Sequence, residues 1–426
     1  MLMIHFYKKH TLGFLMVALA IAFYTYEYFL RVVPSVMIDF YKNEHGLSDA
    51  KISILATAYF LAYTPLQLIV GAIADIFGVR KLLLFSIFIC ILGSLLNASC
   101  FEFSENENAV YYISTVGRFL IGFGSAFAFV AVLKTAREWL PNRYFPIVSG
   151  MTTSVGMLGA ISAQTLLPLM IVYSGYINAL WVMLLAGILL YLVTYRHIAD
   201  NQEHFQAVKD HQIRELFKAL FYVISIPQIW VTGFIGAAMF MPTVIFSDLW
   251  APKFFEDVNH IVHPVSGVIS SLLYWGWIAG SPFVGLLSSY MGKNRIILQC
   301  SSLLAAIAIF SIIYFPTSDP IIAGMMMFLL GLFCSSQVLV FAVANDNVPE
   351  RYLATGVAVT NMLVMCSGFL LPYIGSLLEQ YAYNQAIFNA DGFRQALMVM
   401  PASLFLAFLI SFLLKEKSAE DDGQYK

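Results

Sequence analysis

The stretch Gly71-Ala-Ile-Ala-Asp75-Ile-Phe-Gly78-Val-Arg80-Lys81 lies between two long apolar runs and places one acid and two bases in a short turn. A weaker copy, Gly285-Leu-Leu-Ser-Ser289-Tyr-Met-Gly292-Lys293-Asn-Arg295, follows 214 residues later. The glycines keep their spacing and the basic pair returns, but Ser289 stands at the position of the acid. A loop that recurs at half of the chain length indicates a duplicated protein.

Three further pairs of segments repeat in the same order, with offsets of 204 to 217 residues. They are Pro141-Asn-Arg143-Tyr144-Phe145 with Pro349-Glu-Arg351-Tyr352-Leu353, Leu166-Leu167-Pro168 with Leu370-Leu371-Pro372, and Gly175–Met183 with Gly392–Met400. We therefore predict two halves of parallel topology, related by an axis along the membrane normal.

The composition of the 426-residue chain indicates a membrane protein, because 60% of the residues are hydrophobic, only 11% are charged and the mean hydropathy is +0.78. Soluble proteins carry roughly 25% charged residues. Twelve apolar runs are each long enough to cross ~30 Å of hydrocarbon as a helix. We expect them near 12–38, 50–74, 80–100, 110–135, 146–172, 176–196, 227–251, 264–290, 295–315, 320–345, 354–379 and 393–414.

The fold class predicted from these runs is an all-α membrane protein with twelve transmembrane helices in two pseudo-symmetric six-helix bundles. The expected domains are 1–196, a cytoplasmic linker at 197–226, 227–415, and a short cytoplasmic tail at 416–426. If the N-terminus is cytoplasmic, sixteen Lys and Arg residues fall on that side and four on the other. This positive-inside signal places both termini in the cytoplasm.

The end of the linker repeats apolar residues at helical spacing beside charged ones. These apolar residues are Ile213, Leu216, Phe217, Leu220 and Phe221. One interpretation is an amphipathic helix on the cytoplasmic membrane surface that tethers the halves. The other is a solvated linker that contains a short helix.

Several classes of protein are disfavoured. The five cysteines lack metal-ligand or disulfide spacing and are interpreted as small hydrophobes. No cleavable signal peptide is evident, and the near-neutral net charge of -2 disfavours nucleic-acid partners. The sequence contains no phosphate-binding GxxxxGK[ST] loop, which disfavours an ATP-driven pump. It also shows no nucleophile, metal or paired-carboxylate set within the spans, which disfavours an enzyme. We expect no cofactor, no catalytic residue and no metal site.

Gly71-x-x-x-Asp75-x-x-Gly78-x-Arg80-Lys81 resembles the signature loop between helices two and three of the major facilitator superfamily. Arg118-x-x-x-Gly122-x-Gly124 resembles the second motif of that superfamily. The resemblance covers all twelve expected spans and implies that helices one, four, seven and ten line a central cavity. Ser289 departs from the full signature in the second half.

A looser resemblance points to one branch of this superfamily. The run Tyr26–Met37, with Gly124–Phe129 and Lys134, is similar to the bacterial phagosomal nutrient transporters. That branch is linked to amino acids and nucleosides. An arginine at this place in helix one also resembles organic-anion and organophosphate carriers.

Charged residues inside a bilayer cost roughly 2.5–3.5 kcal/mol each, so each one needs an explanation. Glu27 and Arg31 are four residues apart and share a helix face. Counted from the cytoplasmic ends of their spans, Glu27 lies ~22 Å deep and Arg118 ~24 Å deep. Lys134 lies near the cytoplasmic end of its span, where it either snorkels or serves as a cavity ligand.

We interpret Glu27, Arg31 and Arg118 as an ion-pair network that binds a carboxylate-bearing solute and couples it to a proton. Arginine holds a carboxylate through two parallel hydrogen bonds. Burial favours the neutral form of Glu27 and a neighbouring arginine favours the charged form, so Glu27 is the natural proton carrier. The alternative is a fixed salt bridge that only holds the first half together.

The second half has no equivalent charge cluster, since Met327 stands where Arg118 does. Tyr274, Gln337 and Asn361 are candidates for the non-ionic part of a solute. An aromatic residue such as Tyr274 also suits core packing or an interface belt. Buried amides such as Gln337 and Asn361 need hydrogen-bond partners. Asp248 lies near the outer end of its span.

The signature loop is assigned to gating, through Gly71, Asp75, Gly78, Arg80 and Lys81. Asp75 pairs with the basic turn or with a helix end in one access state. Gly71 permits close helix approach and Gly78 permits the turn. The alternative is a simple turn at the membrane surface.

The function predicted from the sequence is a secondary active transporter that imports an amino acid, a nucleoside or a small organic anion by alternating access with protons. The alternative is an exporter of drugs, siderophores or metabolites by proton antiport. We expect a multi-pass protein of the bacterial inner membrane that works as a monomer, with a small solute, the proton and the lipid bilayer as its partners.

Overall fold

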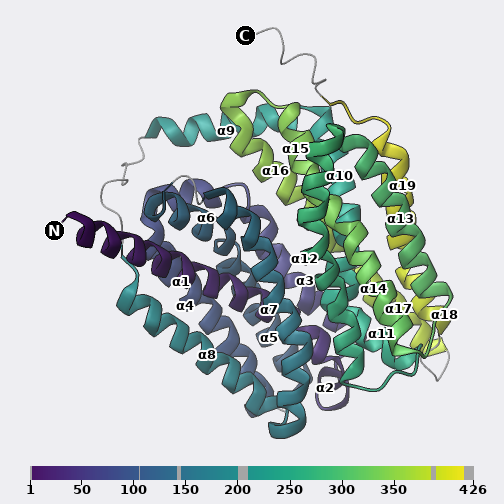
Figure 1. Cartoon of the computed structure of the whole chain (residues 1–426). Coiled ribbons are helices and arrows are strands. Elements are labelled where there is room, and N and C mark those ends of the chain that lie inside the picture. Colours follow the sequence, from purple (N-terminus) through teal and green to yellow (C-terminus); the bar gives the residue numbers. More distant parts are fainter. Residues whose placement is uncertain (1, 105, 142–144, 200–209, 385–389, 417–426) are drawn as a thin grey trace. The chain divides into compact units, whose positions relative to one another are not determined.

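The computed structural model describes residues 2–104, 106–141, 145–199, 210–384 and 390–416. The chain divides into two compact units, Met1–Val208 and Lys209–Lys426. The division falls inside the predicted linker at 197–226. Within each unit the long helices run alongside one another as a bundle (Figure 1).

Unit 1 contains eight helices within its described residues. They are α1 (Leu2–Val36), α2 (Ile38–Asn43), α3 (Asp49–Leu66), α4 (Val70–Phe103), α5 (Glu107–Ser125), α6 (Ala128–Trp139), α7 (Phe145–Ser174) and α8 (Tyr176–His197). α5 packs against α3 and α4, while α1 packs against α6 and α7. α5 begins where the Asn106 side chain accepts hydrogen bonds from the backbone N–H groups of Asn108 (3.0 Å) and Ala109 (3.1 Å).

Unit 2 has the same kind of architecture with more interruptions. Its α-helices are α9 (Asp210–Ile224), α10 (Pro227–Met241), α11 (Ala251–Asp257), α12 (Val265–Met291), α13 (Asn294–Tyr314), α14 (Pro320–Cys334), α15 (Leu339–Asp346), α16 (Leu353–Met365), α17 (Leu371–Asn384), α18 (Ala390–Leu397) and α19 (Val399–Ser411). The π-helix η3 (Pro242–Trp250) and the 3₁₀ segments η4 (Ser335–Val338), η5 (Glu350–Tyr352) and η6 (Cys366–Leu370) join some of them.

Ten helical stretches in the described part of the chain are long and apolar enough to cross a membrane. They coincide with ten of the twelve predicted runs. The other two runs, near 50–74 and 264–290, correspond to α3 and α12, which are helical but are not among the ten. The prediction of an all-α membrane fold is confirmed. The count of twelve transmembrane helices stays a prediction, because it requires that α3 and α12 also cross the membrane.

Large apolar side chains on the outside of the helices agree with a hydrocarbon environment. Leu189 is 63% exposed, Leu286 73% and Ile321 72%. Water does not favour such a surface, whereas lipid chains are as apolar as these side chains.

The duplication is visible in a close helix contact that occurs in each unit. A Cβ on Gly122 of α5 would lie 2.1 Å from the backbone oxygen of Tyr59 on α3. A Cβ on Gly331 of α14 would lie 2.0 Å from the backbone oxygen of Leu273 on α12. Glycine at these two related positions lets the helices touch backbone to backbone.

The signature loop forms its turn at one residue. Gly78 has φ 76° and ψ 163°, a conformation that interrupts α4, and its counterpart Gly292 has φ 60° at the end of α12. Glycine adopts these positive φ values without steric cost. The second predicted span, near 50–74, contains an interruption, because α3 ends at Leu66 and the chain is helical again from Val70 up to the turn at Gly78.

The predicted linker helix is α9, and part of its expected apolar face is buried. Leu220 is 7% exposed, whereas Phe217 and Phe221 are 53% and 74% exposed. Tyr222 contacts the Tyr352 ring at a centroid distance of 5.1 Å. α9 therefore packs on unit 2 and leaves two phenylalanines outward. The side chains of Ile213 and Leu216 lie outside the described residues.

We expect Gly122→Ala and Gly331→Ala each to destabilise the protein by about 1–3 kcal/mol, because the added methyl group has no space. Gly71→Ala is the matched control, since a Cβ there would meet no atom within 4 Å. Thermal unfolding of the detergent-purified protein measures the difference. Equal midpoints for the Gly122→Ala and Gly71→Ala variants would contradict the packing account.

Candidate functional site

The candidate site of unit 1 is centred on Tyr59 of α3. Its hydroxyl donates a hydrogen bond to Oε2 of Glu27 on α1 at 2.9 Å. Its ring centroid lies 5.7 Å from Cζ of Arg31 and 5.2 Å from Cζ of Arg118. Tyr59 and Glu27 are fully buried, and Arg31 and Arg118 are 2% and 3% exposed. The structure thus brings the three predicted charged residues around one tyrosine.

Arg31 lies among three tyrosine rings. Its Cζ lies 4.1 Å from the ring centroid of Tyr28, in addition to its contact with Tyr59, and 5.9 Å from that of Tyr63. The rings of Tyr59 and Tyr63 are stacked with centroids 5.5 Å apart. The electron-rich faces of these rings attract a cation, each contact contributing about 0.5–2 kcal/mol. The rings stabilise the buried guanidinium without removing its charge.

Arg118 contacts the backbone of α1 one turn before Pro34, which lies inside that helix. Proline has no N–H, so Pro34 cannot donate to the carbonyl of Leu30 four residues earlier. Nη1 of Arg118 donates to that Leu30 oxygen at 2.8 Å, and Nη2 donates to the Arg31 oxygen at 3.1 Å. Arg118 therefore provides the donor that the Leu30 carbonyl lacks and also contacts the backbone of Arg31.

A small cavity inside unit 1 borders Arg118. Its volume is about 20 Å³, enough for one water molecule. Its polar lining includes Tyr41, Ser94 and Asn97. A cavity of this size does not admit an organic solute. The two backbone contacts favour a positioning role for Arg118 on α1, and its role as a solute ligand stays a prediction.

The gating candidates lie on α4. Gly71 is exposed, and no atom of the described residues lies within 4 Å of a Cβ built there, so a close helix approach at this glycine stays a prediction. The Asp75 side chain lies outside the described residues. Cζ of Arg80 lies 5.9 Å from the Tyr195 ring centroid of α8, and Lys81 is exposed.

The candidates of unit 2 lie on three different elements, α12, η4 and α16. Tyr274 on α12 is fully buried and donates to Oδ1 of Asp248 at 2.5 Å. Gln337 is 5% exposed in η4, and Asn361 is half-buried in α16. In unit 1, Lys134 lies 3.5 Å from Glu138 one turn later, which favours a role at the helix end over that of a cavity ligand.

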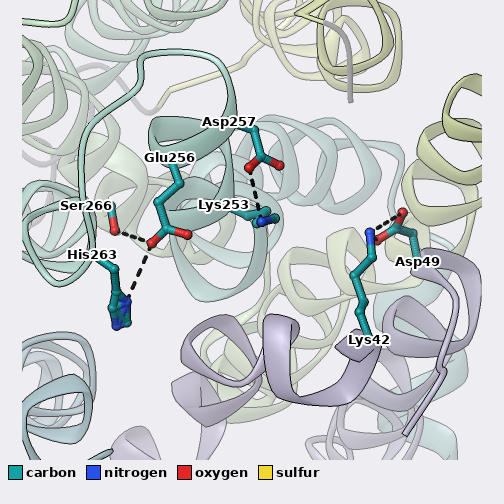
Figure 2. A network of polar contacts seen from close by, with 7 residues as sticks. All are labelled: Lys42, Asp49, Lys253, Glu256, Asp257, His263 and Ser266. Atoms are coloured by element: carbon teal, nitrogen blue, oxygen red, sulfur yellow. Dashed lines mark hydrogen bonds and ion pairs between the residues drawn. The ribbon is translucent and has the colours of Figure 1, made fainter. Parts of the chain in front are cut away.

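Each unit also carries an ion pair at one of the basic residues that the sequence predicts on the non-cytoplasmic side, Lys42 in unit 1 and Lys253 in unit 2. In unit 1, Nζ of Lys42 lies 3.0 Å from the buried carboxylate of Asp49. In unit 2, Lys253 pairs with Asp257 at 3.0 Å, as Figure 2 shows. No group of three His, Cys, Asp or Glu side chains suited to a metal ion occurs among the described residues.

The sequence reasoning missed the tyrosines of the site. Tyr59 and Tyr63 lie four residues apart, so they occupy one face of α3. This spacing was visible in the sequence, but aromatic residues in a membrane helix have many possible neighbours. Only the structure shows that this face meets Glu27 and Arg31.

Comparisons with known proteins agree with this architecture. The family model of the Major Facilitator Superfamily matches residues 14–372. The chain is 24% identical to the probable anion transporter 5 of Arabidopsis thaliana over 423 residues, covering 91% of this chain and 93% of that one. It is 21% identical to the probable sulfoacetate transporter SauU of Cupriavidus necator over 282 residues, covering 64% of each chain.

Among solved structures, a bacterial homolog to the human lysosomal transporter Spinster, in an inward-facing and unoccupied conformation, has a similar fold. The TM-score is 0.75 at 17% sequence identity, with 96% of this chain and 99% of that chain covered. At this identity the likeness concerns the fold alone.

The link between Arg118 and Pro34 gives a direct prediction. Arg118→Ala removes the donor to the Leu30 carbonyl, which Pro34 cannot replace, and an unsatisfied buried carbonyl costs about 1–3 kcal/mol. Pro34→Ala restores an N–H that reaches the Leu30 oxygen. We therefore expect the destabilisation by Arg118→Ala to be smaller in a Pro34→Ala background, as measured by a double-mutant cycle of thermal unfolding. An identical loss of stability in both backgrounds would exclude the proposed link.

Proposed function

The chain belongs to the major facilitator superfamily, and on that basis we propose that it imports a small organic anion together with protons by alternating access. As a member of this superfamily it is an integral, multi-pass membrane transporter and not an enzyme. The solute class, the direction of transport and the proton coupling are the proposed parts.

The observation that carries the proposal is the burial of Arg31 among Tyr28, Tyr59 and Tyr63. A guanidinium in a dry, aromatic environment keeps its charge and binds an anion far more strongly than in water. Its planar fork matches carboxylate and sulfonate groups through paired hydrogen bonds. The relatives whose names mention anions and sulfoacetate support this class of solute.

Glu27 is proposed as the proton carrier. It is four residues from Arg31 on α1, and it accepts the hydroxyl hydrogen bond of Tyr59. When Glu27 is charged, it competes with a solute anion for the positive charge of Arg31. When Glu27 takes up a proton, that competition ends and the solute anion is favoured. Proton binding and anion binding at this cluster then reinforce each other.

The remaining proposals concern the setting of the transporter. We propose that the protein lies in a bacterial inner membrane with both termini on the cytoplasmic side, because the basic residues of the loops gather on the side of the termini. The signature loop, Asp75, Arg80 and Lys81 included, is proposed to gate access. Gln337 and Asn361 are proposed to contact the uncharged part of the solute. Amino acids, nucleosides and small organic acids all have such a part.

Uptake into proteoliposomes tests the proposal. We expect an inward proton gradient to drive the uptake of one class in a labelled panel of carboxylates, sulfonates, amino acids and nucleosides. Arg31→Ala should lower this uptake by at least tenfold, because the anion loses its proposed guanidinium ligand, and Arg31→Lys should restore part of it. Glu27→Gln should abolish the effect of the gradient while solute exchange persists.

Arg394→Ala is the matched control, because Arg394 forms an exposed pair with Asp391 at 2.9 Å. Such pairs contribute little, so this variant should behave as wild type. Export of the same solutes against an inward proton gradient would favour the antiport alternative. Wild-type uptake by both Arg31→Ala and Glu27→Gln would show that the cluster only stabilises unit 1.

A further inference from the structure

Asp248 is a charged residue that the proposed mechanism does not use. It is 6% exposed and lies in η3, within the membrane-spanning stretch Pro227–Asp257. Among the described residues of unit 2, it is the one acidic or basic side chain in the buried set. An ionised carboxylate at such a place is costly, so its presence calls for a function.

The backbone around Asp248 is built unusually. η3 is a nine-residue π-helix with Pro242 as its first residue, and Pro252 follows in α11. Pro252 has no N–H to donate to the Asp248 carbonyl, which is its partner in an α-helix. The backbone N–H of Ala251, just before Pro252, donates to the Phe246 oxygen five residues earlier, and not to an oxygen four residues earlier as in an α-helix. Such wide turns occur frequently at functional sites.

Neighbouring contacts fix the position of the carboxyl group. The Tyr274 hydroxyl donates to Oδ1 of Asp248 at 2.5 Å. The Ser247 hydroxyl donates to the Ser270 oxygen at 2.9 Å, which joins η3 to α12 a second time. One residue before Tyr274, the Leu273 backbone touches Gly331 of α14. The residue next to the tyrosine is therefore held in a close contact between α12 and α14.

The elements packed against η3 supply few other titratable groups. These elements are α10, α11, α12 and η6. α10 carries no charged side chain, η6 contributes Cys366 and α12 contributes Tyr274. The charged residues of α11 make contacts of their own, as Figure 2 shows. Lys253 lies 3.0 Å from Asp257. Glu256 accepts a hydrogen bond from the Ser266 hydroxyl at 2.6 Å and lies 3.6 Å from His263.

We propose that Asp248 is a proton-binding site of unit 2, with Tyr274 as its positioning residue. A proton from the aqueous phase adds to the carboxylate and gives the neutral acid, and the reverse step returns it. The Tyr274 hydroxyl donates to Oδ1 in both forms, so the change of charge breaks no hydrogen bond at that oxygen. This inference rests on the proposed proton coupling, to which it adds a carboxyl group besides Glu27.

Infrared spectroscopy of the purified full-length protein tests the assignment without a solute, with the proton as the probe. We expect a carbonyl band of a protonated buried carboxyl group that titrates reversibly with pH. Asp248→Asn should remove this band, whereas Glu27→Gln and the exposed-acid control Asp391→Asn should retain it. In Tyr274→Phe the band should persist to higher pH, because the carboxylate has lost a donor.

An unchanged set of titrating bands in Asp248→Asn would overturn the inference. If Asp248→Asn does not fold, the Tyr274→Phe spectrum decides alone, and a titration identical to wild type would overturn the inference. The two proposals fail separately. Uptake that ignores the proton gradient would refute proton-coupled import but leave the Asp248 band in place, whereas loss of the assignment would leave coupling through Glu27 untouched.

Discussion

The hydroxyl and ring of Tyr59 connect every charged group of the candidate site. The hydroxyl donates to Glu27 at 2.9 Å, and the ring lies within 6 Å of both arginines. Gly122 lets α5 approach α3 at the backbone oxygen of the same tyrosine. One residue thus joins helix packing to electrostatics. A bilayer interior tolerates a buried acid and two buried bases only when such contacts offset their lost hydration.

The two arginines have different tasks in this arrangement. Arg118 contacts the Leu30 and Arg31 carbonyls of α1, while Arg31 is surrounded by aromatic faces. A carbonyl-bound arginine fixes a helix, whereas a ring-bound arginine keeps its charge available to an anion. In the proposed mechanism Arg118 orients the helix turn that carries Arg31.

Sequence reasoning reached the fold class and the charged residues because both follow from the cost of charge in hydrocarbon. It also found the turn glycines, since Gly78 and Gly292 both adopt positive φ. It missed Tyr59 and Tyr63, because an aromatic residue carries no signal of which helix it will face. It did not foresee the interruption between Leu66 and Val70, because a motif fixes a turn without fixing how the flanking helices run. It also gave no sign that Arg118 contacts the backbone of α1, which only the contacts of the side chain reveal.

The central claim is that the charge of Glu27 and the binding of an anion are linked at the Tyr59 cluster. Proteoliposomes that enclose a pH-sensitive dye test this most directly, with the transported solute added outside in the absence of any initial proton gradient. The account predicts that solute entry acidifies the interior in wild type, and that Glu27→Gln exchanges solute without moving protons. Acidification of equal extent by Glu27→Gln would contradict it.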